Sequence, residues 1–306
     1  MKQIILFLTT ILIAGFSQGQ DSSFSFLTSD SVSLYVRIAG KGAPCLFVHG
    51  GPGSTSNYFE AVDASRLMEQ HYRMIYFDQR GSGRSGSASN GDYSTGRVLK
   101  DMEELRQALN IRQWTVMGHS FAGLIVTPYA YQYPKSISAL ILLHGTLDLK
   151  ASINSHISNG KMLLQQEKRS FSIPDTLPMM EQLSAVHNKL HEEGIWYKLM
   201  FRSQREKDIN DSVTAIIGNP NREFSNKVWG YPEYWEDLTV ITPRIECPVL
   251  VITGSRDYAI GPEQYTRFLF PRKKISVYQG GHASYQEDPK WFFYQVMAFR
   301  KQYPMD

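Results

Sequence analysis

Eight short runs rich in β-branched, aromatic and aliphatic residues recur along the chain. They occupy residues 24–28, 33–38, 45–49, 74–78, 114–118, 139–144, 248–253 and 274–279. Several runs are apolar throughout, which is typical of parallel strands covered on both faces of a sheet. The first two lie close together and alternate apolar with polar residues, so we predict that they form an antiparallel hairpin at one end.

A helical pattern separates the fourth run from the fifth. Leu99, Met102, Leu105 and Leu109 recur at spacings of three and four, with charged residues between them. This spacing gathers apolar side chains on one face of a helix. Strand, helix and strand in succession predict an α/β fold, with a mostly parallel eight-stranded sheet and helices on both of its faces.

Residues 146–242 break this rhythm, because they contain no run that predicts a buried strand. They hold three helix-like runs, at 161–170, 179–194 and 195–208, punctuated by prolines. We therefore predict a helical cap over 146–242, inserted between the sixth and seventh strands. The α/β core then comprises residues 20–145 and 243–306.

The first nineteen residues form a separate segment. Lys2 precedes an apolar stretch from Ile4 to Phe16, and the small residues Ser17 and Gly19 follow it. This pattern predicts a secretory signal peptide over residues 1–19, and hence a secreted or periplasmic protein. The apolar stretch is shorter than the roughly 20 residues of a membrane-spanning helix, so we expect no stable membrane insertion after cleavage. An uncleaved anchor is the alternative.

Composition narrows the classes of function. The 306 residues are 42% hydrophobic and 20% charged, with a formal net charge of +3 and no run of five basic residues. We therefore expect no nucleic-acid partner. Two cysteines exclude a disulfide scaffold and a four-cysteine zinc site. Cys45 and Cys247 each precede an apolar run, which favours free core thiols, although export would permit a bridge.

The sequence GHSFAG, residues 118–123, is the first candidate for chemistry. It lies between a predicted strand and the apolar run LIVTPYAYQYP, which predicts a helix. A serine between small residues on a sharp strand-to-helix turn is typical of a nucleophile elbow. We therefore predict that Ser120 is a nucleophile and that the Phe121 N–H helps to bind an oxyanion. Ala122 stands where the strict pattern G-x-S-x-G has its second glycine.

The sequence HGGPG, residues 49–53, directly follows another predicted strand. A glycine-rich turn at that position can bring a backbone N–H opposite the elbow. Gly50 and Gly51 are the candidate donors, and we assign the role to Gly51. We expect His49 to be structural rather than a base.

Two further candidates follow late strands. Asp257 comes just after the seventh predicted strand and His282 just after the eighth. Open α/β sheets build their sites at the carboxyl ends of their strands. The order Ser120, Asp257, His282 also matches the serine–acid–histidine order of the α/β-hydrolase triad. We predict that these three residues form a catalytic triad.

One glycine pattern is misleading. Gly81, Gly83 and Gly86 spell G-x-G-x-x-G after a strand, but a polar loop follows where a dinucleotide site requires a helix. HEEGI at 191–195 lacks the second histidine of a zinc-protease motif. We therefore expect no cofactor and no metal.

Taken together, HGGPG, DQRGSGRS at 78–85, GHSFAG, GSRD and GGH resemble the proline iminopeptidase branch of the α/β-hydrolases. The resemblance covers residues 24–145 and 243–306. It implies a cofactor-free serine exopeptidase that removes an N-terminal residue, often proline, from short peptides. It also implies cap glutamates that bind the substrate's free amine, since a desolvated ammonium needs a carboxylate partner.

We consider five glutamates of the cap for this role. Glu233 is our candidate because tryptophans and tyrosines surround it in the sequence; the other four are Glu192, Glu193, Glu206 and Glu236. The same aromatic residues could instead pack the cap against the core. None of the five matches the family's motif, and together with Ala122 this leaves the proline preference open.

The sequence therefore predicts an exported serine hydrolase whose substrates are short peptides or other small molecules. The first hypothesis is an aminopeptidase that releases N-terminal residues. The alternative is a carboxylesterase or lactonase that uses the same triad. A non-catalytic binding protein is a third interpretation, against which the intact triad argues. The oligomeric state stays open.

Overall fold

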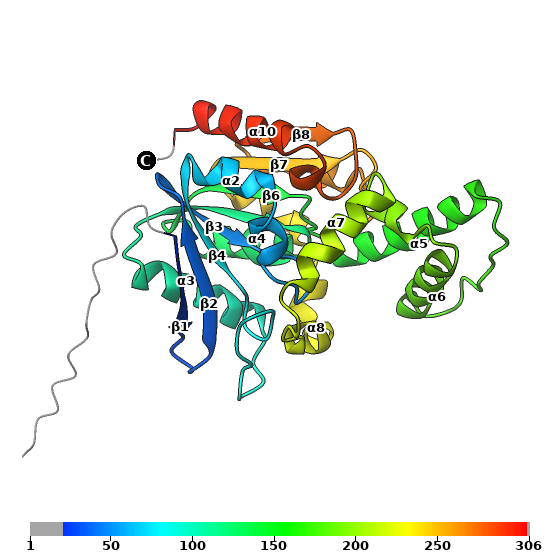
Figure 1. Ribbon diagram of the computed structural model, residues 1–306, viewed down its shortest axis with the longest axis horizontal. Helices are drawn as coiled ribbons and strands as arrows, with labels where there is room; N and C mark the ends of the chain where they lie inside the picture. Colours follow the sequence, from blue (N-terminus) through cyan, green and yellow to red (C-terminus); the bar gives the residue numbers. More distant parts are fainter. Residues whose placement is uncertain (1–20, 305–306) are drawn as a thin grey trace, which may run out of the picture.

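The computed structural model describes residues 21–304, so the proposed signal peptide lies outside the described residues. Eight strands form one sheet (Figure 1). Their bounds are β1 Ser22–Leu27, β2 Ser33–Ala39, β3 Ala43–Val48, β4 Tyr72–Phe77, β5 Trp114–His119, β6 Ile137–Leu143, β7 Val249–Gly254 and β8 Lys273–Tyr278.

The strand order is β1-β2-β4-β3-β5-β6-β7-β8. β1 pairs with β2, and β2 with β4, in antiparallel fashion; every later pairing is parallel. The predicted fold, a mostly parallel eight-stranded sheet with an antiparallel hairpin at one end, is confirmed. The observed bounds differ from the predicted ones by one or two residues at the strand ends.

The central strands are continuously apolar because helices cover both faces of the sheet. All six residues of β5 and of β7 are buried. One face packs against α3 (Thr95–Ala108) and α4 (Gly123–Gln132), and the other against α1 (Asn57–Glu60), α2 (Asp63–Glu69) and α10 (Pro289–Gln302) (Figure 1). The short α9 (Ser284–Glu287) packs beside α10.

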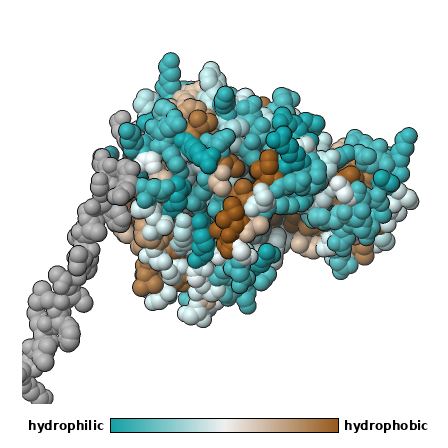
Figure 2. Space-filling view, in the orientation of Figure 1, coloured by the Kyte–Doolittle hydropathy of each residue, from teal (hydrophilic) through white to brown (hydrophobic). Residues whose placement is uncertain are grey.

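Between β6 and β7 the described chain forms helices and no strand. These are α5 Leu149–Gln166, α6 Met179–Glu192, η2 Trp196–Leu199, α7 Gln204–Ala215, α8 Glu223–Lys227, η3 Val228–Gly230, η4 Pro232–Trp235 and η5 Leu238–Arg244. α5 and α6 pack together as a hairpin that projects from the body of the molecule (Figure 1). Figure 2 shows a mostly hydrophilic face with a hydrophobic strip near the middle of the view.

Two of the predicted cap helices are wrong in extent. The first ends at Gln166, and Lys168 has a positive φ of 55°, so 167–170 are not helical. Residues 195–208 are not one helix, because η2 stops at Leu199 and α7 begins only at Gln204. Tertiary contacts impose the break: the Met200 carbonyl accepts the His282 N–H at 2.6 Å, and the Ser203 hydroxyl caps α7.

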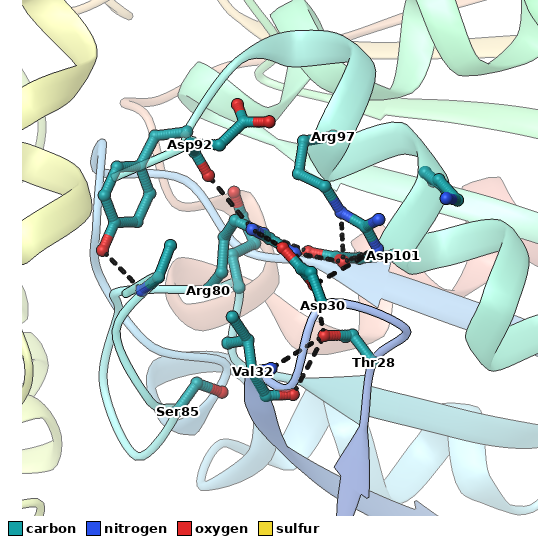
Figure 3. A network of polar contacts seen from close by, with 12 residues as sticks. Thr28, Asp30, Val32, Arg80, Ser85, Asp92, Arg97 and Asp101 are labelled. Carbon is teal, nitrogen blue, oxygen red and sulfur yellow. Dashed lines mark hydrogen bonds and ion pairs between the residues drawn. The ribbon is translucent and has the colours of Figure 1, made fainter. Parts of the chain in front are cut away.

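The loop after β4 is held by a fully buried arginine, Arg80 (Figure 3). Its Nε and Nη2 donate to the two oxygens of Asp101 at 2.6 and 2.7 Å, and Nη1 and Nη2 donate to Asp30 at 2.9 and 3.0 Å. Nη1 also donates to the Asp92 carbonyl at 3.0 Å. All five N–H groups of the guanidinium are therefore used, and they join the β1–β2 turn, the loop and α3.

The same loop also forms backbone hydrogen bonds with the cap. The Gly81 carbonyl accepts from the Phe224 N–H at 2.9 Å, and Gly83 exchanges two backbone hydrogen bonds with Asn221. Gly81 and Gly83 have positive φ, and a Cβ on Gly81 would lie 2.9 Å from the Phe224 nitrogen. These glycines therefore serve a backbone turn and a close contact with the cap.

Both cysteines are free thiols. Burial raises the pKa of Cys45, and it raises the pKa of Cys247 to about 12, which disfavours the reactive thiolate form of both at neutral pH. Within residues 21–304, no helix is long and apolar enough to cross a membrane.

Candidate active site

Ser120 stands on a strained turn between β5 and α4. Its φ is +57°, a region that non-glycine residues seldom adopt, and the 3-10 turn η1 (Ser120–Ala122) leads directly into α4. The glycines on either side of Ser120 are required because a larger side chain would clash. A Cβ on Gly118 would lie 2.6 Å from a methyl of Val126, and one on Gly123 would lie 2.2 Å from the Thr146 carbonyl. The elbow therefore lifts Ser120 above the sheet only because these neighbours lack side chains.

Asp257 and His282 meet beside this turn. His282 Nδ1 lies 2.9 Å from both carboxylate oxygens of Asp257, and both side chains are buried. Burial alone would raise the pKa of Asp257, but the neighbouring imidazoles His282 and His144 outweigh it and hold this pKa below its usual range. Asp257 is therefore a carboxylate that orients the His282 ring.

The other nitrogen of His282 has no partner within residues 21–304, and His282 lines a cavity that it shares with Ser120. His282 Nε2 is buried and has no hydrogen-bond partner among the described residues. His282 and Ser120 both line a cavity of about 130 Å³. The structure therefore places Ser120 and His282 around one cavity, without a hydrogen bond from Nε2 to the hydroxyl.

The HGGPG turn presses against the elbow. A Cβ on Gly50 would lie 2.7 Å from the Ser120 Cβ and 3.3 Å from the Phe121 nitrogen. Gly50 N–H donates to the Tyr58 hydroxyl at 2.9 Å, whereas Gly51 N–H has no acceptor within residues 21–304. Of the two candidate donors, only Gly51 is thus uncommitted, and it lines the cavity with Ser120.

His49 has a different role from these residues. It is buried, and its Nε2 accepts the Gln79 N–H at 3.0 Å. Burial lowers its pKa. His49 therefore ties the HGGPG turn to the loop after β4.

Cap and core together enclose the cavity. The cap contributes Met200, Phe201, Asn210 and Thr214. The remaining lining residues are Gly51, Ser54, Tyr58, His119, Ser120, His282, Ala283 and Tyr285. None of these residues is acidic. A larger hollow of about 1000 Å³ lies away from this chemistry and is lined by residues that precede the strands, such as Arg112, Cys247 and Arg272.

Glu233 is not among the cavity residues. Its carboxylate accepts the Thr95 N–H at 3.2 Å, at the start of α3. The aromatic neighbours that drew attention to it pack the cap on the core: Tyr234 lies 5.5 Å from the Phe121 ring, centroid to centroid. Among the other cap glutamates, Glu206 lies four residues before Asn210 on α7 and therefore shares its cavity-facing side.

Sequence reasoning missed two histidines. His119 Nε2 lies 3.2 Å from the His282 carbonyl, which can only accept, so His119 donates there. Its Nδ1 then accepts from the Tyr58 hydroxyl at 2.8 Å, and Tyr58 in turn accepts from Gly50. One chain of hydrogen bonds thus joins the HGGPG turn, the elbow and the histidine loop.

The second missed residue, His144, bonds to Asp257 at 2.8 Å. His119 ends a buried strand and His144 directly follows one. A histidine at such a position is the sequence feature that could have identified both. The ligand atoms of His144, Asp257 and His282 lie within 4.8 Å of one another. Both imidazoles direct Nδ1 at the carboxylate at hydrogen-bonding distance, which favours a protonated Nδ1 over a metal-binding lone pair.

Comparison with known proteins agrees with this geometry. Residues 44–289 match the family described as the alpha/beta hydrolase fold. Proline iminopeptidase of Clostridioides difficile is 30% identical over 267 residues, covering 80% of this chain and 86% of that protein. Its namesake from Arabidopsis thaliana is 28% identical over 214 residues, which span 67% of this chain and 54% of the plant protein.

Relatives with other names match as well. The proposed carbamate hydrolase RutD of Escherichia coli O44:H18 is 24% identical over 257 residues, covering 82% of this chain and 87% of that protein. A solved structure of a proline iminopeptidase-related protein from Thermus thermophilus superposes with a TM-score of 0.77 at 20% identity, covering 93% of this chain and 98% of that one. The chain therefore belongs to the α/β-hydrolase fold family, in its proline iminopeptidase-like branch.

Proposed function

We propose that this α/β hydrolase is a serine aminopeptidase that releases N-terminal residues from short peptides through an acyl-enzyme. The observation that carries the proposal is the cavity that Ser120 and His282 share. Ser120 stands on the elbow, Ser120 and His282 line the same 130 Å³ cavity, and His282 Nε2 has no hydrogen-bond partner among the described residues. Similarity to proline iminopeptidases supports the peptide substrate.

The residues would divide the work as follows. Ser120 attacks the scissile carbonyl while His282 Nε2 takes its proton and later gives it to the leaving amine. Asp257 holds the imidazole and stabilises its charged form. The N–H groups of Gly51 and Phe121 bind the oxygen that becomes negative. Water then releases the acyl group.

One observation favours a second candidate, an esterase or lactonase acting on small esters. Among residues 21–304, no acidic residue lines the cavity, whereas recognition of a free amine calls for a carboxylate. Glu206 is the acidic residue on the cavity-facing side of α7, and its carboxylate accepts from Gln286 at 3.0 Å. If Glu206 serves the amine, the peptidase proposal has its missing group.

The test uses matched fluorogenic substrates. One set consists of amides of Pro, Ala and Leu with a free amino terminus; the second has that terminus acetylated; a short acyl ester completes the panel. Ser120→Ala is the blank, and we expect it to lose roughly 10³-fold or more in rate. Turnover confined to the free-amine amides supports the aminopeptidase, whereas turnover of the ester alone contradicts it. Export stays a prediction, tested by sequencing the N-terminus of the mature protein.

A further inference from the structure

His144 directly follows β6, at the edge of the sheet where the site lies. Its φ is +49°, and its N–H donates to the Ile252 carbonyl on β7 at 2.7 Å. Histidine tolerates this backbone region better than most side chains do. The ring is fully buried, so every polar atom on it needs a partner inside the protein.

The partners of His144 fix its tautomer. Nε2 lies 2.8 Å from the Ser284 hydroxyl and 3.3 Å from the Ser284 backbone nitrogen. A backbone N–H can only donate, so Nε2 is an acceptor and carries no proton. The proton of the neutral ring is therefore on Nδ1, which donates to Asp257 Oδ2 at 2.8 Å. Burial lowers the pKa of His144, which agrees with a neutral ring.

Asp257 thus receives two imidazole N–H groups. His282 Nδ1 lies 2.9 Å from each of its oxygens, and Ile260 N–H adds a weaker contact at 3.3 Å. His119 is the other titratable group beside His144, with ring centroids 6.2 Å apart. A carboxylate held by several donors loses part of its freedom to rotate and part of its basicity.

We propose that His144 is a positioning residue for the hydrolytic reaction: it aligns the Asp257 carboxylate with His282 and, through Ser284, fixes the loop that carries His282. The inference rests on the proposed function of Ser120, Asp257 and His282. His144 does not line the cavity, so it acts through Asp257 and not on the substrate.

The effect of removing His144 has a definite direction. Without its donor, the carboxylate is less well oriented and becomes a stronger acceptor for His282. The protonated form of His282 is then favoured, so the acid limb of the rate profile moves to higher pH. A histidine that only filled space would change thermal stability and leave this limb in place.

The matched variants are His144→Asn and His144→Leu. The two replacements are similar in size and shape, but only asparagine can donate to Asp257, and it also tolerates the positive φ. The readout is the rate at which a fluorophosphonate labels Ser120 between pH 5 and pH 9. This readout does not depend on knowing the natural substrate. Melting temperatures are recorded for each variant.

We expect His144→Leu to slow labelling by on the order of ten- to a hundredfold, as for one hydrogen bond to a charged group. The acid limb of the His144→Leu rate profile should move to higher pH by about half a unit or more. His144→Asn should recover most of the rate, and Ser284→Ala, which keeps the backbone N–H, should show a smaller loss.

Two results would overturn the proposal. In one, folded His144→Leu labels with the rate and pH profile of the unmodified protein. In the other, both variants slow labelling equally, whatever their melting temperatures. A different result would contradict the proposed function itself: the unmodified protein would be labelled no faster than Ser120→Ala.

Discussion

Replacing Arg80 by lysine tests whether its buried network stabilises the fold. Arg80 makes five hydrogen bonds, to Asp101, Asp30 and the Asp92 carbonyl, with no exposure of its own side chain. Lysine keeps the positive charge but offers three N–H groups from a single point. At least two of the five hydrogen bonds are therefore lost. A single ammonium also cannot reproduce the two parallel hydrogen bonds that Arg80 donates to each of Asp101 and Asp30.

The expected loss of unfolding free energy depends on which hydrogen-bond partners the two carboxylates keep. A buried acceptor left without its donor costs about 1–3 kcal/mol. Asp101 keeps a second arginine, since Arg97 Nη2 donates to it at 2.6 Å. Asp30 is 20% exposed and keeps the Thr28 hydroxyl. We therefore expect Arg80→Lys to lower the free energy of unfolding by about 2–4 kcal/mol, a large part of the roughly 5–15 kcal/mol that such proteins have.

The assay is urea unfolding followed by tryptophan fluorescence, for which the chain has five tryptophans. Arg66→Lys is the control, because Arg66 is 67% exposed and pairs only with exposed Asp63; we expect a change within about 0.5 kcal/mol. If Arg80→Lys costs no more than Arg66→Lys, the network contributes little and the reasoning from donor geometry is refuted.

Three further predictions concern the elbow, the cap and the amine site. Gly123→Ala should abolish labelling of Ser120, because the added Cβ would lie 2.2 Å from the Thr146 carbonyl. A Cβ added at Gly96 would meet nothing within 4 Å, so we expect Gly96→Ala instead to stabilise the protein by about 0.5–1 kcal/mol. Both variants are checked by fluorophosphonate labelling and by melting temperature. In the cap, His156 Nδ1 lies 3.0 Å from His187 Nε2. Burial and His187 lower the pKa of His156 to about 3, and burial and His191 lower that of His187 to about 4. The unfolded chain then binds more protons, so stability present at pH 7 should fall as the pH drops from about 6.5 to about 3. His187→Gln, but not His71→Gln, should flatten this fall in urea unfolding. Glu206→Gln should raise KM for free-amine amides about tenfold or more and leave fluorophosphonate labelling of Ser120 unchanged, with Glu233→Gln as its comparison; equal KM values would remove Glu206 from the site.

Local pattern was enough to predict the sheet, because strands buried on both faces must be apolar along their whole length. The order Ser120, Asp257, His282 could be predicted for a related reason: carboxyl ends of parallel strands meet at one edge. The break at Met200 could not be predicted, since it depends on His282, 82 residues later (282 − 200). Local propensity carries no record of such a partner.

Substrate-binding residues were harder to predict than the residues of the predicted triad, because no motif marks them. Glu233 drew attention through its aromatic neighbours, but its carboxylate bonds to Thr95. His144 was interpreted as the end of an apolar strand. A polar ring that closes such a strand at the site edge is the signal that could have identified it. Which side chains face a cavity depends on how cap and core pack, and no periodicity in the chain encodes that.

The bond between the Met200 carbonyl and the His282 N–H, at 2.6 Å, links the wall of the cavity to the proposed base itself. Buried Glu287 reinforces the link, since it accepts from the Arg202 N–H at 2.7 Å and from the Gly281 N–H at 3.3 Å. Moving this part of the cap away from the core would therefore disturb the histidine. The width of the cavity and the alignment of the proposed base are therefore coupled through one hydrogen bond, so a cap movement that enlarges the cavity would also weaken the base.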